Sequence, residues 1–422
     1  MKKIAIALVI FVLLSVCAVF SGAETEIKTM LVNYETGCVR GVGIPTEHTG
    51  FIGNILDVGS SDVTVHAIGR MWYDGNCESH VLRIVRASDK KIVAEETLKS
   101  GTDGSFSYVE LSEPVTLSAN TTYYLLSDED TFGDSFGDGT CGLYCTGDLA
   151  INGYVLDEGG IYTEKIAPTC GYLAIDLKYS SSPAEVKTIG EEGVLFSEII
   201  KGAGAIRNNF GSLVGATFYV EKPIYVTELG RVFLDGNNQE HTVLLIDMDT
   251  DKVVPGGTAI ISGGTADGEV TFARLDAPVL LEGEHCYYLV SREYMDGDMW
   301  YEGDARHVSS DPNQFTGLGW TYYITSFTTG SGEYGFVGVN LKYMLADMPD
   351  PSVSSETEDT VPAPEQTSEK DAGTSAAPET KEKGGDDGKR EGTSFSVLYI
   401  VIPVVAVAVI AAIIISVKKK KA

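Results

Sequence analysis

The chain has 422 residues, a formal net charge of −29 at pH 7 and 47 glycines. So large an acidic excess excludes a protein that binds nucleic acid through the usual basic surface, and it disfavours docking on anionic lipid. It suits a soluble outer-surface protein that repels its neighbours, and the length allows two or three domains.

The chain begins with a predicted secretory signal peptide, residues 1–23. A basic start of Met1-Lys2-Lys3 precedes an apolar run over residues 4–20, and Ser21-Gly22-Ala23 supplies small side chains for cleavage. An uncleaved N-terminal anchor is the alternative. Either way, the bulk of the chain is expected outside the cell.

One stretch occurs twice in the middle of the chain. Residues 69–76 read Gly-Arg-Met-Trp-Tyr-Asp-Gly-Asn and precede His80. Residues 230–237 read Gly-Arg-Val-Phe-Leu-Asp-Gly-Asn and precede His241 at the same spacing. Further matching segments follow in both copies, which indicates a tandem duplication of one domain.

Both copies predict an all-β fold. From residue 51 onward, short apolar runs recur at a spacing of about ten residues, and Gly, Asp, Asn and Ser separate them. No long run has the period of a helix. We therefore expect two tandem antiparallel β-sandwich repeats of the jelly-roll-like kind, residues 24–180 and 186–345, with a linker over residues 180–193.

Each copy places an arginine on a strand whose two faces are both apolar. Such a strand is expected to lie centrally between layers, which would bury Arg70 and Arg231. An unpaired buried charge is very costly, so each arginine needs a carboxylate or carbonyl partner. Asp74 and Asp235 are the near candidates.

The histidine of each copy has two interpretations. His80 and His241 could bind a ligand or a metal at the mouth of a loop. The favoured interpretation is structural, with the ring nitrogens tying down the Asp-Gly-Asn turn that ends in Asn76 or Asn237. It is favoured because both copies keep the histidine while their outer loops differ.

The cysteines predict disulfides in the first repeat. Cys17 leaves with the signal peptide, and an even number remains, which is typical of an exported disulfide-bonded protein. The second repeat has only Cys286, for which a buried free thiol is favoured. Zinc is disfavoured because no histidine lies near the candidate thiols. The cysteines of the first repeat are Cys38, Cys77, Cys141, Cys145 and Cys170.

The loop after the Tyr-Tyr segment of each repeat is dense in carboxylates and aromatic side chains. It covers residues 127–138 in the first repeat and 291–304 in the second. Three interpretations stay open: a solvated acidic turn, a sugar-binding loop, and a calcium site. The candidate ligand-binding residues are Trp300, Tyr301, Glu302, Asp304, Phe136 and Asp138. The candidate calcium ligands are Asp128, Asp130, Asp134, Asp296 and Asp298.

No signature of catalysis accompanies these loops. The sequence has no G-x-S-x-G elbow, no H-E-x-x-H pair, no P-loop and no dinucleotide fingerprint. We expect no catalytic residue and no cofactor other than possible calcium.

The repeated motifs resemble a known kind of module. The Gly-Arg strand, the Asp-Gly-Asn turn, the histidine strand and the segments 114–125 and 278–289 are similar to jelly-roll β-sandwich modules of secreted bacterial proteins, of the galactose-binding-like or carbohydrate-binding type. The resemblance covers most of residues 51–179 and 211–343. It implies a fold more than a function, and it carries over no catalytic residue.

The C-terminal part predicts a membrane anchor. Residues 347–393 are rich in Pro, Ser, Thr, Glu, Lys and Gly and are expected to form a disordered stalk. Residues 395–417 carry no charge and are long enough for a transmembrane helix, and the lysines within residues 418–422 mark its cytoplasmic end.

Together these features predict a single-pass, membrane-anchored extracellular protein that binds a glycan or the cell wall. An adhesin that binds a surface protein is the first alternative. A surface glycosidase, which would need two carboxylates facing each other across a cleft, is the second.

Overall fold

The structure is a computed structural model that describes residues 26–35, 38–40, 49–130, 133–138, 140–182, 186–202 and 206–347. The predicted signal peptide, the stalk beyond residue 347, the predicted transmembrane helix and the lysine tail lie outside the described residues. Within the described residues, no helix is long and apolar enough to cross a membrane.

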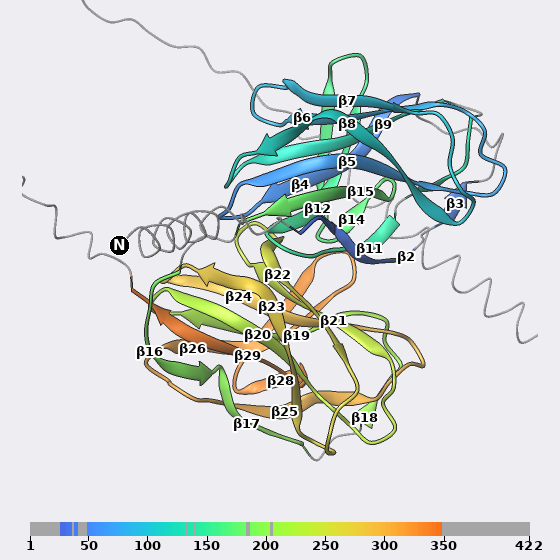
Figure 1. Cartoon of the computed structure of the whole chain (residues 1–422). Coiled ribbons are helices and arrows are strands. Elements are labelled where there is room, and N and C mark those ends of the chain that lie inside the picture. Colours follow the sequence, from blue (N-terminus) through green and yellow to red (C-terminus); the bar gives the residue numbers. More distant parts are fainter. Residues whose placement is uncertain are drawn as a thin grey trace, which may run out of the picture. The chain divides into compact units, whose positions relative to one another are not determined.

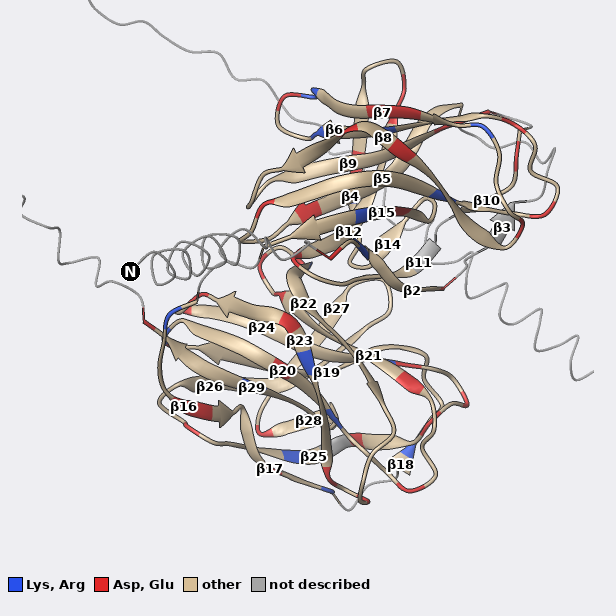
Figure 2. Ribbon diagram, in the orientation of Figure 1, with Lys and Arg blue, Asp and Glu red and all other residues tan. Residues whose placement is uncertain are grey.

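The predicted all-β fold is confirmed, because every regular element in the described part of the chain is a strand (Figure 1). The strands pair antiparallel and form stacked, sandwich-like sheets. Acidic side chains are spread over loops and strands of both halves of the chain, whereas Lys and Arg are sparser (Figure 2).

The first half of the described chain forms a four-stranded sheet, a six-stranded sheet and shorter pairings. The four-stranded sheet has the order β1 (Lys28–Thr29), β15 (Ile175–Ser181), β5 (Val63–Trp72) and β8 (Ser105–Leu117). The six-stranded sheet has the order β13 (Tyr162–Ile166), β12 (Leu149–Asp157), β4 (Gly50–Val58), β9 (Thr122–Glu129), β6 (His80–Arg86) and β7 (Ile92–Leu98). The shorter pairings are β14 (Cys170–Gly171) with β11 (Thr140–Cys145), β11 with β2 (Leu31–Glu35), and β10 (Phe136–Asp138) with β3 (Cys38–Arg40).

The second half has the same two kinds of sheet in the same order. Its four-stranded sheet runs β16 (Thr188–Val194), β29 (Val339–Ala346), β20 (Ile224–Val232) and β23 (Val270–Leu281). Its six-stranded sheet runs β27 (Phe327–Ser331), β26 (Phe315–Tyr323), β19 (Ser212–Val220), β24 (His285–Glu293), β21 (Glu240–Asp247) and β22 (Lys252–Ser262). The smaller sheet joins β25 (Trp300–Ser309) to β17 (Phe196–Ile200), β18 (Ile206–Arg207) and β28 (Tyr334–Val337).

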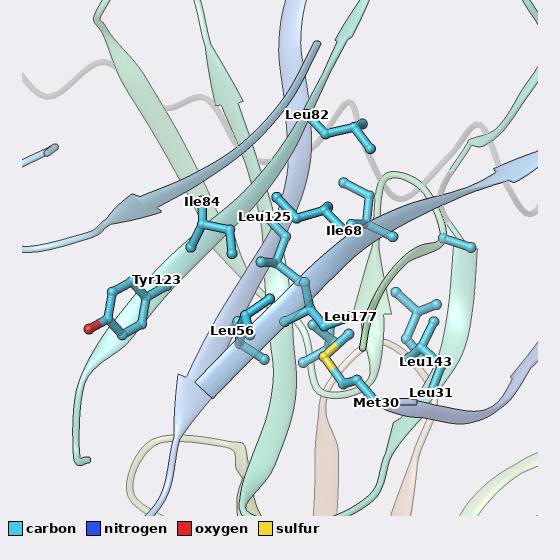
Figure 3. Close-up of a cluster of buried hydrophobic side chains, with 14 of the residues drawn as sticks. Met30, Leu31, Leu56, Ile68, Leu82, Ile84, Tyr123, Leu125, Leu143 and Leu177 are labelled. Atoms are coloured by element: carbon cyan, nitrogen blue, oxygen red, sulfur yellow. The ribbon is translucent and has the colours of Figure 1, made fainter. Parts of the chain in front are cut away.

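The core of each half lies between its two larger sheets. In the first half, Ile68 on β5 meets Leu56 on β4 and Leu125 on β9, and all three are fully buried (Figure 3). Strand β5 alternates between buried and partly buried positions before it becomes buried throughout, as a strand between two layers does. The Gly-Arg strands β5 and β20 each have a neighbouring strand on both sides within their sheet.

The first and last strands of the second half pair with each other. Strands β16 and β29 run antiparallel, with Thr188 opposite Ala346 and Val194 opposite Lys342. Much of the expected linker over residues 180–193 is therefore strand, because β15 continues to Ser181 and β16 begins at Thr188. The linker prediction is too long.

The two halves belong to one compact unit and are in contact. Asn152 accepts a 2.7 Å bond from the backbone N–H of Val253 and donates a 3.1 Å bond to its carbonyl. Glu35 accepts two bonds of 2.8 and 2.7 Å from the guanidinium of Arg292. Around these bonds, Tyr144 of the first half packs into an apolar cluster that consists mostly of second-half residues.

Candidate functional site

A buried arginine–glutamate pair occurs at the same place in each half. Arg70 donates two bonds of 2.9 Å to the carboxylate of Glu129, and Arg231 donates two of 2.9 Å to Glu293. Ser127 and Ser291 each donate a further bond to the glutamate of their own half. Every buried donor and acceptor here has a partner, which is the condition for a stable buried pair.

The prediction that Asp74 and Asp235 pair with the two arginines is therefore wrong. Asp74 and Asp235 lie in exposed turns, and the true partners follow in the chain after 59 and 62 residues. The arginines lie on the central strands β5 and β20, and the glutamates lie at the ends of β9 and β24. Strand pairing, not closeness in sequence, brings these charges together.

The two histidines make matching contacts in the two halves, with residues of the later loop and not with the Asp-Gly-Asn turn itself. One ring nitrogen of His80 lies 3.0 Å from the carbonyl of Asp128, and the other lies 3.1 Å from Oδ2 of Asp134. His241 makes the same two contacts, at 3.1 Å each, with the carbonyl of Arg292 and with Asp298. Both rings are buried.

The Asp-Gly-Asn turns are fastened to the loops that carry Asp134 and Asp298. Asn76 exchanges two hydrogen bonds with the backbone of Ser135, and Asn237 exchanges two with the backbone of Met299. Each buried aspartate also accepts backbone N–H bonds from the residues that follow the turn, at 2.8 to 3.0 Å. The motif that recurs in the sequence thus forms a hydrogen-bond network that joins one loop to another.

Two candidate calcium ligands, Asp134 and Asp298, belong to this hydrogen-bond network. Burial raises the pKa of Asp134, but the backbone N–H groups of Cys77 and Glu78 and the contact with His80 outweigh it, and the pKa is held below its usual value. The same causes lower the pKa of Asp298. Both carboxylates are ionised and already occupied by protein donors.

The remaining calcium candidates do not form a site with them. Asp128, Asp130 and Asp296 are exposed. In the described ranges, no group of three or more metal-ligating side chains comes together. The positions of the carboxylates therefore give no support to the calcium interpretation.

The sugar-loop candidates also lie elsewhere than expected. Trp300 and Tyr301 are 2% and 6% exposed, and Phe136 is 4% exposed, so the expectation that these rings project from an open loop is wrong. The reason is that strand β25 begins at Trp300, which places that ring in the apolar core. The side chains of Asp138 and Asp304 lie outside the described part of the structure.

Trp300 nevertheless lines a hollow that the sequence did not indicate. Its volume is about 280 Å³, close to the lower end of the usual range for ligand sites, about 300–1,000 Å³. The residues that line it come from distant parts of the second half. They are Arg207, Phe210, Val214, Trp300, Tyr322, Ile324 and Phe336.

Aromatic rings set the shape of this Trp300 hollow. Phe336 meets the ring of Trp300 edge-on, with centroids 6.1 Å apart, and meets that of Tyr322 edge-on at 6.4 Å. Phe210 meets Tyr322 edge-on at 6.0 Å. The indole N–H of Trp300 is buried and has no hydrogen-bond partner among the described residues.

An ion pair borders the hollow. The guanidinium of Arg207 lies over the ring of Trp300, 5.1 Å from its centroid. It donates a hydrogen bond of 2.8 Å to the carboxylate of Glu302 and one of 2.7 Å to the side-chain oxygen of Asn209. Glu302, a predicted contact residue, is partly exposed and reaches the hollow through its ion pair with Arg207, which lines it.

The first half has smaller or different residues at matching positions. Across β25 and β18, Trp300 lies opposite Arg207, and across β10 and β3, Phe136 lies opposite Arg40. Tyr322 pairs with Val214, and at the matching register Leu156 pairs with Ile52. Leucine and phenylalanine thus stand where the hollow has tyrosine and tryptophan.

The thiols provide no metal site among the described residues. Cys77, Cys145 and Cys286 are free. Burial raises the pKa of the Cys145 thiol well above its ordinary value, which makes it unreactive. Cys170 is not a free thiol, and it lies directly opposite Cys141 in the β11–β14 ladder. The half-buried position of Cys286 differs from the fully buried one expected.

Comparison with models of known protein families gave no match, and no curated protein matches the chain.

Proposed function

We propose that this chain is a membrane-anchored extracellular binding protein, and that the Trp300 hollow in its second β-sandwich binds a glycan. The observation that carries the proposal is the hollow itself, where aromatic rings surround a space of about 280 Å³ beside a partly exposed ion pair. A sugar ring has one face of C–H groups and a rim of hydroxyls. The aromatic rings suit the first, and the ion pair suits the second.

The placement outside the cell rests on the two ends of the sequence. Residues 1–23 have the pattern of a signal peptide, and residues 395–417 are an uncharged run followed by lysines. The stalk over residues 347–393 would hold the folded part away from the membrane. Protease added to intact cells should release the folded part, and full protection of it would contradict this topology.

The two halves are proposed to be copies of one jelly-roll-like module. The matching strand orders and the repeated arginine, glutamate and histidine contacts support this origin. Since the hollow differs at Trp300 and Tyr322, the copies have diverged at the place where a ligand would sit. We therefore assign binding to the second copy.

A glycan array and a pull-down on purified cell wall, with the full-length chain, test the proposal. The informative variant is Tyr322→Leu, which copies the leucine of the first half. It should weaken glycan binding about tenfold, or about 1.4 kcal/mol, under conditions in which the variant is still folded. Tyr225→Leu is the control, because that tyrosine lies on β20, away from the hollow.

Other outcomes would favour other functions. Capture of a protein but no glycan, through the loop that exposes Met295 and Met299 at 67% and 42%, would favour the adhesin. Methionine side chains adapt to varied partner surfaces. Release of sugar from the cell wall would favour the glycosidase.

A further inference from the structure

The charges around the Trp300 hollow restrict the kind of saccharide that it can hold. Arg207 is the one cationic side chain among the described residues that line it. A lone guanidinium at this position would attract the carboxylate of an acidic sugar, since arginine forms bidentate bonds with carboxylates. The charge of Arg207, however, is not free.

Glu302 neutralises Arg207. The two charged groups are 2.8 Å apart, and the guanidinium is further committed to Asn209 and to the face of Trp300. An acidic sugar would have to displace the Glu302 carboxylate while remaining beside it. Two carboxylates at such a distance repel each other, and the net charge of −29 adds a long-range repulsion.

We propose that the Trp300 hollow selects neutral saccharides and rejects acidic ones, with Glu302 as the residue that determines this specificity. This inference rests on the proposed function of the hollow. A neutral pyranose places its C–H face on the partly exposed rings of Tyr322 and Phe336, while the buried ring of Trp300 forms the floor of the hollow. Its hydroxyls can donate to Glu302 and accept from Arg207 without breaking the ion pair between them.

The ion pair itself is a modest contributor to stability. Its two side chains are 28% and 41% exposed, and exposed pairs are typically weak. Replacing Glu302 should therefore leave the fold intact and free the guanidinium of Arg207 for another carboxylate.

The test compares oligomers of glucose and N-acetylglucosamine with oligomers of galacturonic acid, as ligands of the full-length chain at low salt. The wild-type chain should bind a neutral oligomer at least about tenfold more tightly than the acidic one. Glu302→Gln should bring the acidic oligomer within about twofold of the neutral one. That gain should disappear at high salt, because it comes from an exposed charge.

Glu333→Gln is the matched control. Glu333 pairs with Arg306 at 2.7 Å, is exposed, and does not line the hollow, so this variant changes the net charge equally. Equal effects of the two substitutions, or a wild-type preference for the acidic oligomer, would overturn the neutral-sugar inference and leave glycan binding standing. Absence of binding to any saccharide would overturn the proposed function and the inference with it.

Discussion

Arg231 and Glu293 face each other across the core of the second half through two parallel hydrogen bonds of 2.9 Å, and both side chains are almost completely buried. Arg70 and Glu129 make the same pair in the first half. Such a pair is sensitive to the loss of one member, because the other charge then remains buried without compensation.

Arg231→Met should therefore destabilise the chain by about 3–5 kcal/mol. The double variant Arg231→Met with Glu293→Met should lose less stability than the single variant, since no charge is left unpaired. Urea unfolding measures the free energy of unfolding of both variants. A single variant that is more stable than the double one would contradict the argument.

We predict that the buried His307 makes the folded chain less stable in mild acid. It is buried against Phe196, with both ring nitrogens unpaired among the described residues, and burial lowers its pKa to about 4. An unfolded histidine titrates near about 6.5. Between these values the unfolded chain binds more protons, so stability falls as the pH falls from about 6.5 to about 4, by up to about 3 kcal/mol.

The variant His307→Phe checks this origin. Phenylalanine can keep the stacking on Phe196 but cannot bind a proton. Unfolding midpoints measured from pH 7 to pH 4 should fall less steeply in the variant than in the wild type. Two parallel profiles would show that another group causes the acid sensitivity.

From the two hydrogen bonds of Asn152 we predict that the contact between the halves stabilises the chain. Asn152→Ala removes both bonds to the Val253 backbone and leaves that buried N–H and carbonyl without their partner. A loss of about 1–3 kcal/mol is expected. Hydrogen exchange gives a local measurement, because the amide of Val253 should lose its protection, and unchanged protection would contradict the contact.

The thiols predict a specific labelling pattern. Antiparallel neighbours such as Cys141 and Cys170 lie within the Cα separation that a disulfide requires, and we predict that these two are linked. Without reductant, an alkylating reagent should modify exposed Cys77 in the folded chain, and Cys145 only after unfolding. Peptide mass spectrometry identifies the linked pair, and labelling of Cys170 without reductant would contradict the disulfide.

The sequence predicted the elements whose signals are local. The Asp-Gly-Asn turns and the histidines after them lie within a few residues of each other, so the sequence shows the recurring motif, but the aspartates that contact the histidines lie far along the chain. The glutamate partners did not follow, because Glu129 and Glu293 stand among other acids far along the chain. Only the pairing of β9 and β24 with their neighbours selects these two.

The hollow could not be predicted for a similar reason. Arg207, Trp300 and Phe336 belong to three short or distant strands that meet only in the fold. Residues 291–304 looked like one long loop, because acids and glycines interrupt the apolar pattern. In the structure, β25 begins inside that stretch, which turned an expected surface tryptophan into a buried one.

The pairing of β16 with β29 has a mechanical consequence. With Thr188 opposite Ala346, the chain enters and leaves the second half at the same end of one ladder. A pull applied between these two points would open the ladder one hydrogen bond at a time, like a zipper, instead of shearing all its bonds together. The resistance of the second half to tension would then be set by these two strands, and its core would bear little of the load.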